Sequence, residues 1–225
     1  DVEYARSKGI EVINAGEATA QSVAELTIWL MIGILRKAHF GYHQLRKGKW
    51  AKKEALGFEL CGKTLGIIGV GNIGYRVGCI ASRGLGMRVI GYRRRLELVR
   101  PPVEPVSLDK LLSESDIISI HVPLTPETRR MINDEKIARM KDGVFIVNTS
   151  RMEILDLDAI VRGLRSGKIA GFAADTNIKP EHPKIVELLS MPNVLLTPHI
   201  GAQTYEAQER AAVFIANTIV KMMRG

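Results

Sequence analysis

Short apolar runs separated by segments of helical length fill the chain from Thr64 onward. Most runs are apolar throughout instead of alternating, which is typical of strands covered on both faces. The runs occupy 65–69, 88–92, 117–122, 144–148, 169–174 and 193–197, and helices are expected at 72–84, 108–114, 134–140, 156–166 and 184–190. This alternation of strand and helix predicts an α/β fold built on a doubly wound parallel sheet.

The segments outside this alternation are expected to be helical. Residues 22–48 are predicted as one long helix with weak points at Gly33 and Gly41, and its first half is apolar on nearly every face. Such a helix must be buried against other protein, either in the core of this domain or at an interface between subunits or domains. A second helix is expected over 205–223, with the face that carries 211–216 packed on the sheet.

Composition limits the partners that the chain can have. Its 225 residues suffice for one large domain, and its 32 Lys and Arg exceed its 24 Asp and Glu, which favours anionic ligands. Two cysteines form neither a disulfide framework nor a metal set, so we expect no metal. The longest apolar stretch, 26–35, is far shorter than the about 20 residues of a membrane span. No secretory leader is visible, and we expect a cytoplasmic protein without membrane contact.

A glycine motif follows the first apolar run. Gly69, Gly71 and Gly74 have the G-x-G-x-x-G spacing between a strand and a helix, with Asn72 and Ile73 inside the motif. The first glycine permits a tight turn, the second lets a pyrophosphate approach the backbone, and the third lets helix and strand pack closely. A glycine turn that binds nothing is the alternative. The strand before, the helix after and a correctly spaced second strand favour a dinucleotide site.

Three consecutive arginines end the second run, about 20 residues after the glycine motif, where such folds usually place an acid for the adenosine ribose. An acid would repel a phosphate on the 2′-hydroxyl, whereas Arg93 and Arg94 would attract it. The run therefore predicts NADP(H) over NAD(H), with an ordinary solvated charge run as the alternative. Nucleic-acid binding is not expected, because no recognition motif or aromatic interleaving accompanies the arginines.

Motifs along the whole chain resemble the D-isomer-specific 2-hydroxyacid dehydrogenases, which include phosphoglycerate dehydrogenase and glyoxylate or hydroxypyruvate reductases. They are "GKTLGIIGVGNIG", "SDIISIHVPLTPETRRMIN", "MKDGVFIVNTSR", "LRSGKIAGFAAD" and "NVLLTPHIGAQTYEAQ". The resemblance implies a Rossmann-type cofactor domain over 22–204, a C-terminal helix over 205–225, and a crossover segment over 1–21 from a missing N-terminal substrate domain. It also implies a homodimer and a small 2-keto or 2-hydroxy acid substrate.

The resemblance assigns roles to individual residues. Arg151 matches the arginine that grips the substrate carboxylate and keto oxygen, and His199 matches the acid/base histidine. Asp175 resembles the residue that accepts from the nicotinamide carboxamide, with a turn-capping aspartate as the alternative. The remaining matches are expected to lie along the cofactor, and they are His121, Val122, Pro123, Thr149 and Ser150. For His121 the expected role is positional, not catalytic.

Two positions depart from the family pattern. Met152 stands where the family usually has glycine after the catalytic arginine. Pro180 stands where the family has the glutamate that orients the histidine, and Glu181 follows one place later. A one-residue slip of the loop would restore the Glu181–His199 pair and raise the pKa of the histidine, whereas a broken pair would weaken catalysis. The second outcome favours an alternative function, a dinucleotide-binding regulator like the corepressor branch of the family.

Overall fold

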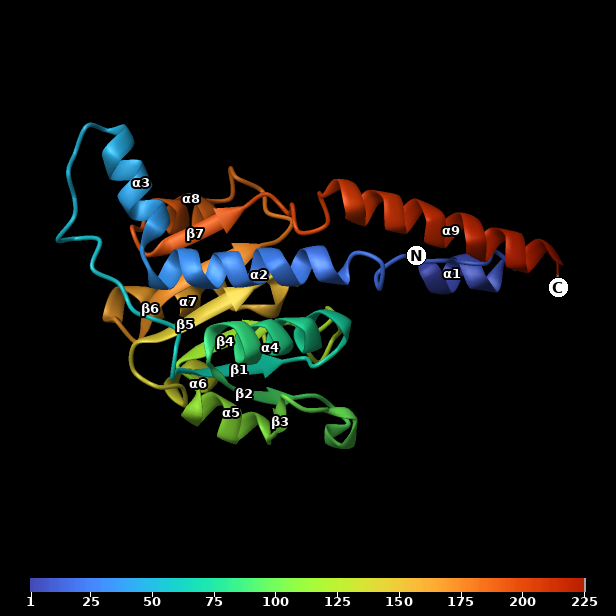
Figure 1. Ribbon diagram of the computed structural model, residues 1–225, viewed down its shortest axis with the longest axis horizontal. Helices are drawn as coiled ribbons and strands as arrows, with labels where there is room; N and C mark the ends of the chain where they lie inside the picture. The colour runs from blue at the N-terminus through green and yellow to red at the C-terminus, as the bar shows by residue number, and fades with distance from the viewer. Residues whose placement is uncertain (225) are drawn as a thin grey trace.

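A seven-stranded parallel sheet between two layers of helices forms the centre of the computed structural model, which describes residues 1–224 (Figure 1). The strands lie in the order β3-β2-β1-β4-β5-β6-β7. Their bounds are β1 Thr64–Ile68, β2 Arg88–Tyr92, β3 Glu104–Pro105, β4 Ile117–Ile120, β5 Val144–Asn148, β6 Ile169–Asp175 and β7 Val194–Thr197. The predicted doubly wound fold is confirmed. The edge strand β3 was not predicted, because two residues are too few for a recognisable apolar run.

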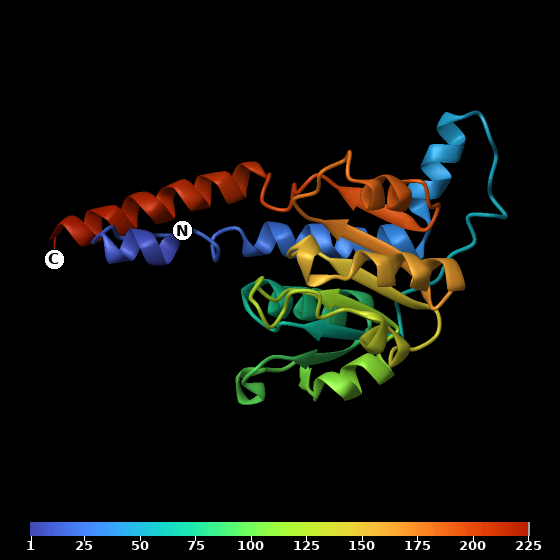
Figure 2. The ribbon, with the colours of Figure 1, turned by 180° about the vertical axis from the view of Figure 1, so that it is seen from behind.

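Helices cover both faces of the sheet. Helices α2 (Ala20–Leu35) and α4 (Asn72–Leu85) pack together on the face at the front of Figure 1. The opposite face, seen in Figure 2, carries α5 (Leu108–Glu114), α6 (Asp134–Ala138), α7 (Leu157–Ser166) and α8 (Pro183–Leu189). Each face has its own apolar core, with Leu30 and Ile67 in one and Phe172 in the other, all without exposed surface. Burial on both faces explains why the strands are apolar throughout.

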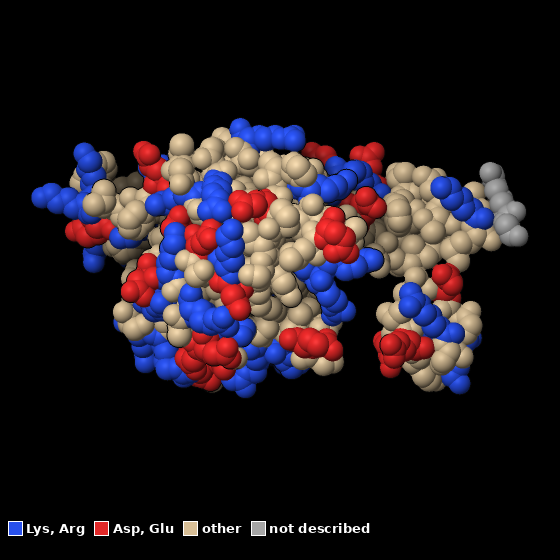
Figure 3. Space-filling view, turned by 90° about the horizontal axis from the view of Figure 1, so that it is seen from below, with Lys and Arg blue, Asp and Glu red and all other residues tan. Residues whose placement is uncertain are grey.

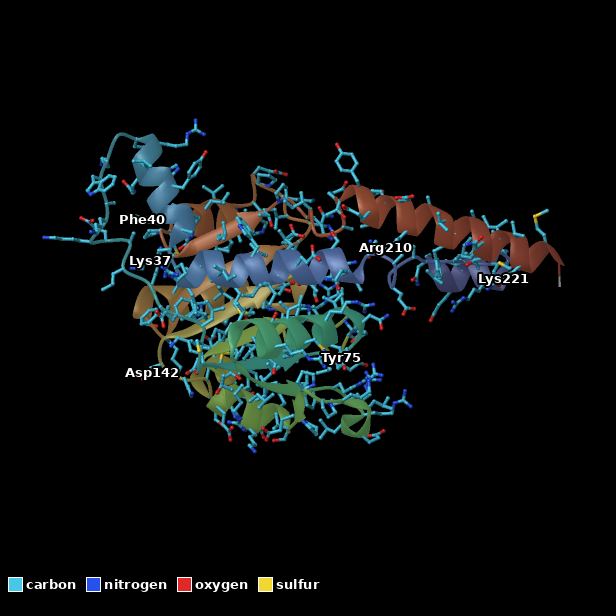
Figure 4. All side chains as sticks on the ribbon, in the orientation of Figure 1. Lys37, Phe40, Tyr75, Asp142, Arg210 and Lys221 are labelled. Carbon is cyan, nitrogen blue, oxygen red and sulfur yellow. The ribbon has the colours of Figure 1, made fainter. Side chains whose placement is uncertain are left out.

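The helix predicted over 22–48 is two helices, which corrects the sequence interpretation. Helix α2 ends at Leu35, and α3 (Ala38–Arg46) begins after Lys37, whose φ of 49° is left-handed (Figure 4). The end of α2 is capped by a returning loop, in which Phe58 N–H donates to Leu35 O at 3.0 Å. Gly33 lies inside α2, where a Cβ would come within 3.0 Å of Leu195 Cδ2, so glycine permits close packing at this point. The break therefore lies where the sheet ends and α3 leaves the domain.

Helices α1 (Val2–Ser7) and α9 (Tyr205–Arg224) project beyond the edge at which the strands end (Figure 1). Figure 3 shows them as two separate projections. The prediction that 211–216 packs on the sheet is wrong, since Val213 and Phe214 are 54% and 40% exposed. The last strand, β7, is covered by α2 and α8, and α9 projects away from the sheet (Figure 1). Within residues 1–224, no helix is long and apolar enough to cross a membrane.

Candidate active site at the carboxyl edge of the sheet

The carboxyl ends of parallel strands meet at one edge, and nearly all the predicted site residues lie there. A cleft of about 1240 Å³ opens at this edge between the glycine loop, the arginine run and the loop after β4. Crevices at the carboxyl ends of such sheets are where doubly wound folds bind ligands. The predicted residues that line the cleft are Gly69, Gly71, Arg93, Arg94, His121, Val122 and Pro123. Arg151 follows β5, Asp175 ends β6 and His199 follows β7.

The glycine loop has the geometry that a pyrophosphate needs. Gly69 has a φ of +100°, and a Cβ there would lie 2.7 Å from the carbonyl carbon of His121. A Cβ on Gly74 would collide with Gly69 O. Gly71 caps α4 without a side-chain hydrogen bond, and a Cβ on it would meet no atom within 4 Å. The first-turn amides of α4 therefore remain available to an anion in open space, so these residues fit a dinucleotide.

Cations line the far side of the cleft. Arg93 is half-buried and its Nη1 donates to Leu98 O at 3.5 Å, whereas Arg94 is exposed. Sequence reasoning missed Arg129, Arg130 and Lys136, which line the same cleft, because only the fold brings the loop after β4 opposite β2. The "RR" pair at 129–130 was the available signal. Among residues 1–224, no group of His, Cys, Asp and Glu side chains could hold a metal ion.

His121 lies at the end of β4 in a chain of hydroxyl groups. Its Nε2 is 2.8 Å from Ser119 Oγ, and its Nδ1 is 3.3 Å from Thr149 Oγ1. Burial lowers the pKa of His121 to about 3, so the ring is neutral near pH 7. A neutral ring bound on both nitrogens supports the positional role that was expected. Ser150 Oγ also binds within the protein, donating to Ile120 O at 3.0 Å.

The neutral state of His121 should make the domain sensitive to acid. An unfolded histidine binds a proton below about pH 6.5, whereas the folded one, with a pKa of about 3, does not until far lower pH. The free energy of unfolding should therefore fall as the pH falls from 6.5 towards 3. We expect His121→Asn to reduce this fall by about 2 kcal/mol between roughly pH 6.5 and 4.5, measured by urea unfolding. Exposed His43→Asn is the control, and parallel curves for wild type and His121→Asn would contradict the assignment.

Asp175 holds the loop that carries His199. The Asp175 side chain is buried, and its Oδ1 accepts from Thr197 Oγ1 at 2.7 Å and from Ile200 N–H at 2.8 Å. Its Oδ2 accepts from Gly201 N–H at 2.8 Å. His199 itself is exposed with a φ of 56°, a left-handed conformation uncommon for a histidine. The carboxylate therefore caps the loop, which was the alternative to a nicotinamide contact.

The two departures from the family pattern have different structural consequences. Met152 is 6% exposed and joins the core, and its φ is not positive, so no glycine is required there. Glu181 is exposed and, within the described residues, forms no hydrogen bond or ion pair with His199. Arg151 is also exposed at the end of β5, where its Nη1 donates to Ser150 O at 2.8 Å. The arginine and the histidine are thus both available to a ligand, while the Glu181–His199 pair is not formed.

Comparison with known proteins decides the family. Residues 28–201 match the family model described as "D-isomer specific 2-hydroxyacid dehydrogenase, NAD binding domain". The chain belongs to this family. It is 47% identical to the hydroxypyruvate reductase of Thermotoga maritima and 43% identical to the D-3-phosphoglycerate dehydrogenase of Methanocaldococcus jannaschii. These matches cover 98% and 100% of the chain, but 72% and 43% of the relatives.

The solved structures agree with this family assignment. A glyoxylate reductase from Paecilomyes thermophila superposes with a TM-score of 0.88 at 38% identity, over 97% of this chain and 67% of the other. The predicted family, the Rossmann-type fold and the assignment to a family of enzymes are confirmed. The matched part of the family is its NAD-binding domain, which supports a nicotinamide cofactor for this chain.

Proposed function

We propose that the chain is the cofactor-binding part of a D-2-hydroxyacid dehydrogenase acting on a small 2-keto or 2-hydroxy acid. The observation that carries this proposal is the position of exposed Arg151 and His199, at strand ends on the edge where the dinucleotide cleft opens. The relatives are named as reductases or dehydrogenases of hydroxypyruvate, 3-phosphoglycerate and glyoxylate, which suggests the substrate class. We place the activity in the cytosol, where thiols such as those of Cys61 and Cys79 stay reduced.

The two side chains have complementary chemistry for this reaction. The nicotinamide cofactor supplies or accepts the hydride at C2 of the substrate. The planar guanidinium of Arg151 suits a bidentate grip on the substrate carboxylate and keto oxygen, and its charge polarises the carbonyl. His199 would donate a proton to that oxygen during reduction and accept it in the reverse direction. Between the two cofactors we propose NADP(H), held through Arg93 and Arg94.

Turnover of candidate substrates tests the proposal. A polypeptide that carries this chain together with a substrate domain should oxidise reduced nicotinamide with glyoxylate, hydroxypyruvate or phosphohydroxypyruvate. The 225-residue chain alone should bind cofactor and turn these acids over negligibly, because a closing domain is needed to exclude water. Cofactor binding without turnover in the longer polypeptide would favour the alternative, a regulator of the corepressor type. This alternative is motivated by Glu181, which within the described residues forms no hydrogen bond or ion pair with His199.

We also propose a homodimer formed through α2, α3 and the loop that follows α3. Trp29 on α2 is 51% exposed. Tyr42 on α3 is 64% exposed, and Trp50 in the loop that follows α3 is 82% exposed. Large aromatic side chains in such positions are typical of interfaces. Sedimentation at micromolar concentration should show a dimer for wild type and a monomer for Trp29→Glu. Tyr205→Glu on α9, 95% exposed in wild type, should stay dimeric, and a monomeric wild type would contradict the proposal.

A further inference from the structure

Helix α2 buries two hydroxyl side chains on an otherwise apolar surface. Ser22 is 5% exposed and Thr27 is 0% exposed. A buried hydroxyl is unfavourable unless it is hydrogen-bonded, so the partners of these two residues show what the helix gains from them. The partners lie on two different segments at the carboxyl edge of the sheet. One segment carries His199 and the other leads to Arg151.

Ser22 binds the segment that carries His199. A serine in a helix can donate to the carbonyl four residues back, but Ser22 Oγ donates to Gly201 O at 2.6 Å, which lies 179 residues away. The same segment is held from β6 by Asp175, whose Oδ2 accepts from Gly201 N–H at 2.8 Å. Gly201 is therefore bound through its carbonyl by α2 and through its amide by β6. The left-handed turn at His199 is fixed from both sides.

Thr27 binds the segment that leads to Arg151. Its Oγ1 donates to the carbonyl of Val23 at 2.8 Å, so that oxygen can only accept from Thr149 Oγ1, at 3.0 Å. Thr149, having donated, is left to accept from His121 Nδ1 at 3.3 Å. His121 is neutral because burial lowers its pKa to about 3, so its Nε2 accepts from Ser119 Oγ. Every donor in this series of hydrogen bonds is thereby assigned. The assignment places the His121 proton on Nδ1.

We propose that Ser22 and Thr27 are positioning residues, which hold the His199 segment and the Thr149–Arg151 segment in fixed register on one helix. This inference rests on the proposed function. Helix α2 suits the role because it packs on α4, β5, β6 and β7, which resists its displacement relative to the sheet. Misplacement of a reacting group by 1 Å can reduce a rate by about 100-fold, so the two hydrogen bonds to this one helix, of 2.6 and 3.0 Å, matter for catalysis.

Two measurements on the 225-residue chain test the positioning without any turnover. Nitrogen-15 NMR should show the Nδ1–H form of His121 in wild type and in Thr27→Ser. In Thr27→Val the Thr149 hydroxyl loses its acceptor and donates to Nδ1, so the ring should change to the Nε2–H form. Ser22→Ala should make hydrogen exchange at the Ile200 and Gly201 amides about 10-fold faster. An Nε2–H ring in wild type, or unchanged exchange in Ser22→Ala, would overturn the proposal.

Kinetics of the longer polypeptide separate positioning from simple stability. Ser22→Ala should lower kcat about 10-fold, because it removes one hydrogen bond that positions His199 for the chemical step. The cofactor Kd should change by less than about 2-fold, because this bond does not act on cofactor binding. The matched control is Ser115→Ala, which removes a buried hydroxyl that donates to Leu111 O at 2.6 Å before β4, at the opposite edge of the sheet. It should lower the Tm and leave kcat unchanged.

The possible failures of the two proposals are distinguishable. Equal losses of Tm in Ser22→Ala and Ser115→Ala with kcat unchanged in both would show that Ser22 only stabilises the fold, and would overturn the positioning role. Absence of turnover in wild type would refute the proposed function instead. In that case the NMR and exchange measurements would still decide whether α2 holds the two segments.

Discussion

Replacing His199 with asparagine should lower kcat for 2-keto acid reduction by about 100- to 10,000-fold, the range that a positioned acid/base contributes. Asparagine is the sharpest choice because it tolerates the left-handed backbone at this position, where φ is 56°, but cannot exchange a proton near neutral pH. The loop should keep its capping bonds to Asp175, so the cofactor Kd should stay close to that of wild type. Steady-state kinetics on a polypeptide with a substrate domain would measure the effect.

His182→Asn is the matched control for this substitution. His182 is exposed, caps α8 by accepting from Lys184 N–H at 3.2 Å, and asparagine can make the same cap. Its kcat should equal that of wild type. A loss in His199→Asn smaller than about 10-fold would exclude His199 as the proton carrier. Glu181→Gln should leave the activity–pH profile unchanged, since within the described residues Glu181 forms no hydrogen bond or ion pair with His199. An acidward shift would show that the loop rearranges to form the pair.

The domain should bind NADP(H) about 10- to 150-fold more tightly than NAD(H), because each charge-assisted hydrogen bond to a 2′-phosphate contributes about 1.5–3 kcal/mol. Arg93 and Arg94 follow β2 and line the cleft that also contains the glycine loop. Arg129 adds positive charge from the opposite wall, whereas Arg130 is paired with Asp156 at 2.6 Å. Titration of both cofactors at moderate ionic strength measures the preference. Equal affinities, or tighter NAD(H), would refute it.

Variants distinguish a specific phosphate contact from the general positive charge of the chain. Arg94→Gln should weaken NADP(H) binding about 10-fold and leave NAD(H) binding nearly unchanged. The control Arg83→Gln removes the same charge from the exposed end of α4, at the opposite edge of the sheet, and should affect neither cofactor. If Arg83→Gln and Arg94→Gln weakened NADP(H) equally, the arginine run would act only through long-range electrostatics.

Local patterns were sufficient for every strand except the edge strand β3, and for the glycine loop. The apolar runs could only be buried strands, and the glycine spacing requires a turn that Gly69 makes with a φ of +100°. Helix ends were less predictable. The break at Lys37 depends on a loop that returns to cap the end of α2 through the Phe58 N–H to Leu35 O hydrogen bond. The residues of α2 and α3 do not themselves indicate this contact. The prediction that α9 packs on the sheet was wrong for the same reason, since its apolar residues 211–216 do not indicate which surface they would cover.

The sequence by itself determined the apolar strands and the glycine motif, because these depend on periodicity and spacing. Its resemblance to the family suggested the roles proposed for Arg151 and His199. Only the tertiary structure decided how those side chains are held. Asp175 caps the loop that carries His199, Ser22 on α2 binds the same loop, and Thr27 on α2 binds Thr149. These hydrogen bonds join residues up to 179 positions apart. Which residues are joined depends on which loops the folded sheet brings against α2. A local sequence pattern does not contain that information.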